Sequence, residues 1–381
     1  MTHDIRFNRA SVMGRELDLI RESMEGGHTA SSGPFSKQVT DVLRAETRSP
    51  DVLLTTSCTA ALEMSALLLD LQPGDTVIVP SYTFTSSALA FAREGAQILF
   101  CDIEPETLGP DPASVAALLD DSVRAVVVVH YAGIACDIDG LRAVLKDRPD
   151  VAIVEDNAHG LFGRWRDQPL GSLGRFSTLS FHETKNFVCG EGGALVLNEE
   201  RDVDRAWVLY EKGTDRRAFF MGTVDKYSWR DTGSSFGLSD TLAAYLLGQL
   251  EQRDAIQGTR RRVFEAYREG LAPYAEEFGL RLPVVPEHCE PAYHMFYVLM
   301  PSHETRTRVM GRLKDRGIHT TFHYVPLDSS IAGQQFAKRP SECPVSADVS
   351  ARLMRLPFHN QLTTDDTSRV LDELVGALGD A

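Results

Sequence analysis

The chain has 381 residues, of which 43% are hydrophobic and 24% charged, a globular composition that excludes a disordered or fibrous protein. Its 39 Lys and Arg residues against 54 Asp and Glu residues give a net charge of −15, so we expect neither nucleic acid nor a membrane as a partner. No apolar run of about 18 residues occurs, and residues 1–15 lack the apolar core of a signal peptide, which predicts a cytoplasmic protein. No CxxC pair is present, so we expect free thiols and no metal site.

Short apolar runs alternate with helical patterns through the first two thirds of the chain. The expected strands are 52–54, 76–80, 97–101, 125–130 and 151–156, and the expected helices are 60–71, 86–94, 112–119 and 141–147. The runs at 125–130 (AVVVVH) and 151–156 (VAIVED) are apolar up to their last one or two residues, as in strands that are covered on both faces. Strands that alternate with helices predict βαβ units and a mostly parallel sheet.

The pattern changes after residue 177. Short strands at 177–181 and 194–198 flank the glycine-rich sequence GEGG, and a persistently helical stretch over 239–274 suits a connection between two lobes. Beyond it we expect strands at 293–300 and 319–324 and helices at 306–316 and 365–378. We therefore predict a large α/β domain over residues 1–245 and a smaller C-terminal α+β domain over residues 246–381.

Two residues about thirty positions apart could carry chemistry. Asp156 ends a buried strand, at the edge of an α/β sheet where ligands bind, although a helix cap or a surface ion pair is an ordinary alternative. Lys185 lies between a short strand and GEGG, where a desolvated amine could form a Schiff base, although most lysines are simply exposed. Together they suggest pyridoxal phosphate (PLP), which needs a lysine for its aldehyde and an acid beside its ring nitrogen.

Other residues could hold such a cofactor. Cys58 and Thr59 follow Ser57 at the start of a predicted helix, where backbone N–H groups and hydroxyls bind phosphate, and Ser180 could add a further hydroxyl. Phe84 could stack on a planar ring. Helix capping and core packing are the alternatives for these residues.

Other motifs give little support to a different ligand. GEGG lacks the GK[ST] of a P-loop, and no GxGxxG follows an early strand. His319 and His323 are four residues apart on a predicted strand with no third ligand nearby, so a structural role is favoured over a metal site.

In this order, the motifs resemble those of the DegT/StrS-type sugar-nucleotide aminotransferases, which are PLP enzymes of fold type I, the aspartate aminotransferase fold. The resemblance covers nearly the whole chain and rests on SCTAALEM, PSYTFTSSA, HYAG, VEDNAHG, SFHETKN, GEGGA, VDKYSWRDTGSSFGLSD and FHYVPL. SFHETKN, EKGTDRRAFF and DKYSWRDTGSS are most similar to the branch that acts on dTDP-4-dehydro-6-deoxyglucose and makes dTDP-4-amino-4,6-dideoxyhexoses, such as the dTDP-4-amino-4,6-dideoxygalactose transaminases.

The resemblance implies a role for each cofactor residue. Lys185 would form the Schiff base and carry protons, Asp156 would pair with the ring nitrogen, and Phe84 would stack on the ring. His159 stands at a position that is often Gln and would bond the ring hydroxyl, so its proton state would depend on pH. The phosphate would be held by Cys58, Thr59 and Ser180.

The resemblance also implies a homodimer with shared active sites. Ser235 stands where many relatives carry an Asn that reaches the phosphate of the neighbouring subunit, and the serine side chain is shorter. Tyr324, His323 and Arg230 would bind the sugar nucleotide.

The implied reaction is a ping-pong transamination. An amino acid, glutamate by resemblance, would give its amino group to the cofactor, which would pass it to the C4 ketone of the dTDP-sugar, with either the galacto or the gluco epimer as product. The alternatives are a PLP-dependent sugar-nucleotide enzyme of another type (a 3-aminotransferase or a 3-dehydrase) and a non-catalytic regulatory relative. The dehydrases replace the Schiff-base lysine with His, and a regulatory relative is expected to lose Asp156 or Lys185; both residues are present here.

Overall fold

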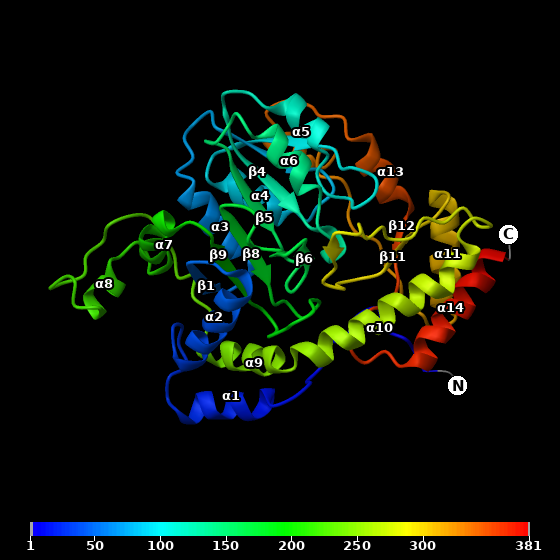
Figure 1. Cartoon of the computed structure of the whole chain (residues 1–381), viewed down its shortest axis with the longest axis horizontal. Helices are drawn as coiled ribbons and strands as arrows, with labels where there is room; N and C mark the ends of the chain where they lie inside the picture. Colours follow the sequence, from blue (N-terminus) through cyan, green and yellow to red (C-terminus); the bar gives the residue numbers. More distant parts are fainter. Residues whose placement is uncertain (1–2, 380–381) are drawn as a thin grey trace.

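A seven-stranded sheet forms the centre of the larger part of the molecule in this computed structural model, which describes residues 3–379 (Figure 1). The strand order is β1-β9-β8-β5-β4-β2-β3. The strands are β1 (Asp51–Thr55), β2 (Thr76–Pro80), β3 (Gln97–Cys101), β4 (Val123–Val129), β5 (Ala152–Asp156), β8 (Phe176–Ser180) and β9 (Gly193–Leu197). Of these seven, β9 alone runs in the direction opposite to the other six, so the predicted mostly parallel sheet is confirmed.

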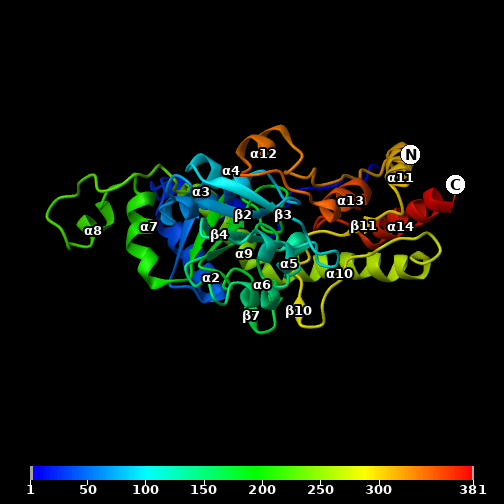
Figure 2. The ribbon, with the colours of Figure 1, turned by 90° about the horizontal axis from the view of Figure 1, so that it is seen from above.

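Helices cover both faces of this sheet because its central strands are apolar on both sides. Val127 of β4 packs in one cluster with α3 (Cys58–Leu68) and α4 (Ser86–Arg93), whereas its neighbours Val126 and Val128 pack in another with α5 (Pro112–Leu118) and α6 (Ile138–Val144). Figure 2 shows the two pairs of helices on opposite sides of the sheet. This alternation follows from the two-residue period of a strand.

The helices α1 (Glu16–Glu25) and α2 (Pro34–Thr47) were not expected from the sequence and pack against α9 (Asp240–Glu251). The predicted helical stretch 239–274 is two helices, α9 and α10 (Arg253–Leu271), which meet at Gln252. In Figure 1, α10 runs from beneath the sheet to the smaller part of the molecule.

The smaller part packs α10, α11 (His303–Asp315) and α14 (Thr364–Gly379) over the two-stranded sheet of β11 (Tyr297–Leu299) and β12 (Leu353–Arg355). Ile5, near the N-terminus, belongs to the same core. Along α10, Ile256 still packs with the large part and Val263 with the small one. The predicted division after residue 245 stays a prediction.

Two expected strands differ from the structure. The strand predicted over 293–300 has only the three residues of β11, and the strand predicted over 319–324 is wrong. There the chain makes a single bridge, from Thr321 to Arg355, and then leaves the sheet. Two residues of FHYVPL, His323 and Tyr324, instead line a cavity that is described below.

The remaining elements are short. They are α7 (Val203–Tyr210), α8 (Arg216–Phe220), α12 (Ile331–Phe336), α13 (Pro344–Arg352), the strands β6 (Arg164–Trp165), β7 (Gln168–Pro169) and β10 (Cys289–Glu290), and three 3-10 turns at Tyr131–Gly133, Glu200–Asp202 and Ala272–Tyr274. Residues 213–235, which include α8, form an arm that projects from the body on the left of Figure 1. Of the helices within residues 3–379, none has the length and apolar character needed to cross a bilayer.

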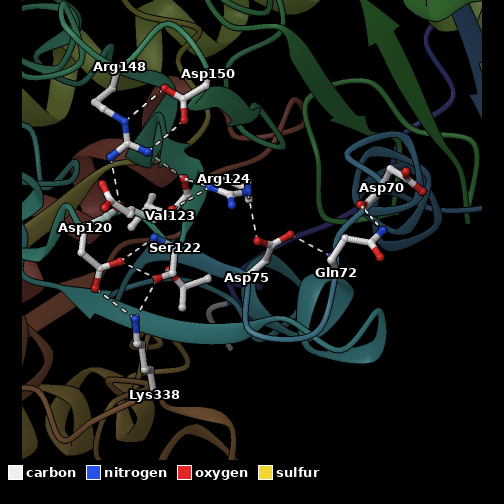
Figure 3. Close-up of polar contacts among 12 residues, drawn as sticks. Asp70, Gln72, Asp75, Asp120, Ser122, Val123, Arg124, Arg148, Asp150 and Lys338 are labelled. Atoms are coloured by element: carbon white, nitrogen blue, oxygen red, sulfur yellow. Dashed lines mark hydrogen bonds and ion pairs between the residues drawn. The ribbon is translucent and has the colours of Figure 1, made fainter.

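A polar network joins the amino ends of β2 and β4 (Figure 3). Lys338 Nζ donates to Asp120 Oδ2 at 3.0 Å and to Ser122 Oγ at 2.7 Å, while Arg124 pairs with Asp75 at 2.9 Å. Hydrogen bonds from Ser122 and Lys338 lower the pKa of Asp120 to about 2. These contacts stabilise the edge of the sheet opposite to the one at which the carboxyl ends of the strands meet.

Candidate active site

A cavity of about 480 Å³ lies at the carboxyl ends of the parallel strands, within the usual range of about 300–1,000 Å³ for small-molecule sites. Its lining includes most of the predicted site residues, which come from the ends of β1, β2, β5 and β8 and from the small part of the molecule: Cys58, Thr59, Phe84, Asp156, His159, Ser180, Lys185, His323 and Tyr324. The structure therefore brings together residues that are up to 266 positions apart (324 − 58).

Asp156 is buried at the end of β5 and oriented by two donors. Ser87 Oγ donates to its Oδ2 at 2.5 Å, and the N–H of Ala158 donates to its Oδ1 at 3.3 Å. Ser87 was not identified from the sequence, although it lies in the quoted motif PSYTFTSSA, three residues after Phe84. A hydroxyl at this place holds the carboxylate in one orientation.

Lys185 lies in the turn between β8 and β9, where its N–H donates to the carbonyl of His182 at 2.9 Å. Burial lowers the pKa of its amine to about 8, and the nearby Cys58 and Asp156 only partly oppose this shift. A sizeable share of the amine is therefore uncharged near neutral pH. An uncharged lysine amine is a nucleophile that can attack an aldehyde.

The N-terminus of α3 forms one wall of the cavity. Ser57 caps the helix by accepting from the N–H of Ala60 at 3.1 Å, while the N–H groups of Cys58 and Thr59 precede the first hydrogen bond within the helix. Burial raises the pKa of the Cys58 thiol to about 12, so this side chain adds no negative charge. Such a helix end attracts a phosphate group.

Gly193 of β9 permits this arrangement. A Cβ built on Gly193 would lie 2.4 Å from the backbone of Ser57 and Cys58. The last glycine of GEGG is thus required for the close approach of β9 to the N-terminus of α3, a role that the sequence alone did not indicate.

His159 stacks on a second histidine that the sequence analysis missed. The rings of His159 and His294 are parallel to within 11°, with centroids 4.1 Å apart. His294 Nδ1 donates to Asn186 Oδ1 at 2.8 Å, because the amide nitrogen of Asn186 donates to the carbonyl of Ala292. Burial lowers the pKa of both histidines well below the usual value, so both are neutral. His159 Nδ1 is buried without a partner, as expected of an atom that faces a ligand.

The segment with His323 and Tyr324 closes the cavity from the small part of the molecule. The hydroxyl of Tyr131 donates to the carbonyl of His323 at 2.9 Å, and that of Tyr82 donates to the same atom. The Tyr324 ring lies 6.1 Å from that of Phe84. Phe84 is 55% exposed, so one face of its ring is free to stack on a planar ligand.

This set of residues fits PLP. A buried amine, a buried carboxylate, a helix N-terminus, a free aromatic face and an unpartnered imidazole nitrogen line one cavity. Among residues 3–379, no group of three or more His, Cys, Asp or Glu side chains is arranged to hold a metal ion. The individual roles of these residues stay predictions.

Arg230 and Ser235 do not line the cavity of their own chain. Both lie in or beside the arm. Arg230 pairs with Asp215 at 2.6 Å, and exposed Ser235 makes a backbone bridge to Glu211. They could act at an active site only in a second copy of the chain, as the predicted dimer requires.

The known proteins that are similar to this chain in sequence or structure include aminotransferases and a protein of polysaccharide biosynthesis. The chain is 28% identical to the spore coat polysaccharide biosynthesis protein SpsC of Bacillus subtilis, over 97% of this chain and 96% of that protein. It is 29% identical to the aminotransferase TlmJ of Streptoalloteichus hindustanus, with a TM-score of 0.90 and 99% of both chains covered. The putative sugar aminotransferase Spr1654 of Streptococcus pneumoniae, in its apo-form, has a TM-score of 0.91 at 24% identity, over 99% of this chain and 98% of that one, which shows a shared fold.

A family model described as "DegT/DnrJ/EryC1/StrS aminotransferase family" matches residues 11–375, nearly the whole chain. The match agrees with the fold type I architecture and with the cavity in which Lys185 and Asp156 lie. The chain therefore belongs to the DegT/DnrJ/EryC1/StrS family of PLP-dependent aminotransferases, which confirms the family, the enzyme class and the cofactor that its motifs predict.

Proposed function

We propose that this enzyme transfers an amino group from L-glutamate to the C4 ketone of dTDP-4-dehydro-6-deoxy-D-glucose in the cytoplasm, giving a dTDP-4-amino-4,6-dideoxyhexose. The observation that carries the transamination is the placement of Lys185 and Asp156 in one buried cavity with a phosphate-binding helix end. The sugar class is supported by the names of relatives such as SpsC and Spr1654. The dTDP-sugar and the 4-position rest on the motifs SFHETKN, EKGTDRRAFF and DKYSWRDTGSS.

PLP, when bound, supplies an aldehyde that takes up the amino group and a ring that accepts electrons. Lys185 Nζ removes the proton from the α-carbon of the donor and later delivers one to C4 of the sugar. Its lowered pKa suits both steps, because a proton carrier works best near the pH of its surroundings. Asp156, held by Ser87, keeps a proton on the ring nitrogen, and neutral His159 bonds the ring hydroxyl. Phe84 stacks on the ring, while the N–H groups and side chains at Cys58 and Thr59, with Ser180, hold the phosphate.

We further propose that the enzyme is a homodimer in which each arm contributes to the active site of the partner. Large apolar side chains of the arm are exposed, including Phe220 at 71% and Trp229 at 83%. Such exposure is unusual for a monomer and indicates a covered surface. An arm docked on a second copy would bring Arg230 to its sugar nucleotide and Ser235 to its phosphate.

The proposal is tested by incubating the purified, PLP-loaded enzyme with L-glutamate and dTDP-4-dehydro-6-deoxy-D-glucose. We expect a product in which CH–NH2 replaces the C4 carbonyl, so that its mass is slightly higher than that of the keto substrate. NMR coupling at C4 then distinguishes the galacto from the gluco epimer. Lys185→Ala should abolish the visible absorption of the lysine-bound cofactor and reduce turnover by several orders of magnitude. Near-normal turnover in that variant would exclude the mechanism, and an amine at C3 would exclude the 4-position.

A further inference from the structure

Arg355, at the end of β12, is a charged residue of the cavity that the mechanism above does not use. Its side chain lines the cavity together with Lys185 and Asp156, yet the residue is only 8% exposed. Among residues 3–379, no carboxylate lies within ion-pair distance of its guanidinium, and its Nε is buried without any hydrogen-bond partner. Burying an unpaired charge costs free energy, and an arginine cannot avoid this cost by losing its proton.

The contacts that Arg355 does make orient it without neutralising it. Its Nη1 donates to His323 Nδ1 at 2.6 Å, and its guanidinium lies 5.0 Å from the centre of the Phe7 ring. Burial lowers the pKa of His323 to about 4, so this imidazole is a neutral acceptor at neutral pH. A stacked aromatic ring and a neutral acceptor hold a planar cation in place and leave its charge for a ligand.

We propose that Arg355 binds a carboxylate of the amino donor through paired hydrogen bonds, a role that rests on the transamination proposed above. The planar fork of a guanidinium matches the two oxygens of a carboxylate. A donor amino acid must bring its amino group to the cofactor at Lys185. Its α-carboxylate is bonded to the same α-carbon as that amino group and therefore lies next to the reacting atoms. Arg355 and Lys185 line the same cavity, so a donor whose amino group reaches Lys185 has its carboxylate in the space that Arg355 faces.

The diphosphate of a sugar nucleotide is the other anion that could approach Arg355. A nucleotide is large and needs an open path, whereas Arg355 is over nine-tenths buried and its guanidinium contacts His323 and the ring of Phe7. The smaller carboxylate is therefore favoured, and the experiment below separates the two anions.

The test uses the PLP-loaded enzyme and two unreactive probes. Glutarate is a dicarboxylate without an amine, and dTDP is a nucleotide diphosphate without a sugar. Their affinities are measured by calorimetric titration for the unmodified enzyme, R355Q and R355K, together with the visible absorption of the bound cofactor. We expect R355Q to keep the visible band and the affinity for dTDP but to bind glutarate about 30-fold or more weakly, since a buried charged contact is lost. R355K should bind glutarate about 10-fold more weakly, because it keeps the charge and loses the paired geometry.

Arg306 provides a matched control. Its guanidinium is also buried, has an unpartnered Nε and lies 4.7 Å from the ring of Phe322, but it does not line the cavity. R306Q should change the affinity for glutarate by less than about 3-fold. If R355Q does not fold, R355K carries the test.

Each other outcome has a definite meaning. Unchanged glutarate affinity in R355Q or R355K overturns the assignment, as does a loss of dTDP binding with glutarate binding retained. An unmodified enzyme that shows the visible band but binds no glutarate also overturns it and leaves the proposed function intact. The absence of a visible band in the unmodified enzyme, after loading with PLP, refutes the proposed function instead.

Discussion

The buried amine of Lys185 gives a quantitative prediction about cofactor capture. Because burial lowers its pKa to about 8 from a reference value of 10.5, the cofactor-free protein should react with PLP at neutral pH far faster than an ordinary lysine does. At pH 7.5 the uncharged share of the amine is about 24% for a pKa of 8 and about 0.1% for a pKa of 10.5, a ratio of roughly 240. The observed rate should rise with pH and level off above about pH 9.

The rate is measured by stopped-flow absorbance after mixing PLP with cofactor-free enzyme between pH 6 and 11. A free lysine derivative, assayed in parallel, corrects for the ionisation of PLP itself, and Lys185→Ala gives the background. A midpoint near pH 8 supports the reasoning. A midpoint above pH 10 would show that the amine is fully solvated and would refute the buried position of Lys185.

The same shift affects the stability of the cofactor-free protein. Since the pKa of Lys185 is lower in the folded state, the unfolded chain binds more protons between about pH 8 and 10.5, so stability rises with pH in that window. Below pH 8 the shift of about 2.5 units corresponds to a cost of at most about 3 kcal/mol. Lys185→Met should therefore stabilise the cofactor-free protein by about 1–3 kcal/mol at pH 7, as measured by urea unfolding.

Three further predictions concern other parts of the molecule. Ser87→Ala should lower kcat about 10-fold while PLP stays bound, because the carboxylate of Asp156 loses the hydroxyl that orients it. Steady-state kinetics measure kcat and the visible band reports bound PLP; an unchanged kcat would contradict the prediction. Replacing both Phe220 and Trp229 with Ser should convert the proposed homodimer to monomers in analytical ultracentrifugation, whereas a dimer that persists in this variant would exclude the arm as its contact. Asp120, whose pKa is about 2 in the folded state, contributes stability above about pH 4, and this contribution is lost as the pH falls towards 2. Because its side chain is 41% exposed, Asp120→Asn should reduce this acid-dependent loss by only about 1 kcal/mol. Acid unfolding curves that are identical for the variant and the unmodified protein would contradict the assignment.

Local patterns in the sequence were sufficient to predict the parallel core and to single out Asp156 and Lys185, which line one cavity. The predicted strands 76–80 and 97–101 match β2 and β3, and the strand ending at Asp156 matches β5 except for its first residue. These strands are covered on both faces, so their apolar runs are unbroken. The carboxyl ends of parallel strands share an edge, which is why Asp156 and the lysine after β8 could be expected to meet.

The rest of the site could not be read from local patterns, because its residues depend on contacts between distant segments. His294 stacks on His159 from 135 positions away (294 − 159), in a sequence that reads as a strand. Arg355 lies at the end of a three-residue strand, next to ordinary core residues. The segment 319–324 has the composition of a strand, but its residues His323 and Tyr324 line the cavity instead of a sheet. In each of these cases, tertiary packing decides the role of the residue.

The charges of the cavity divide its tasks among different kinds of residue. Burial keeps the two stacked histidines and the Cys58 thiol neutral and brings the pKa of Lys185 near neutral pH, so this lysine can readily exchange a proton. Arg355 keeps its charge under the same burial, because a guanidinium does not lose its proton in proteins. A lysine at position 355 would be desolvated by the burial of this position, and desolvation lowers the pKa of an amine. A permanent cation that binds an anion beside a titrating amine therefore has to be an arginine, and this physical requirement is why R355K is expected to weaken carboxylate binding more as the pH rises.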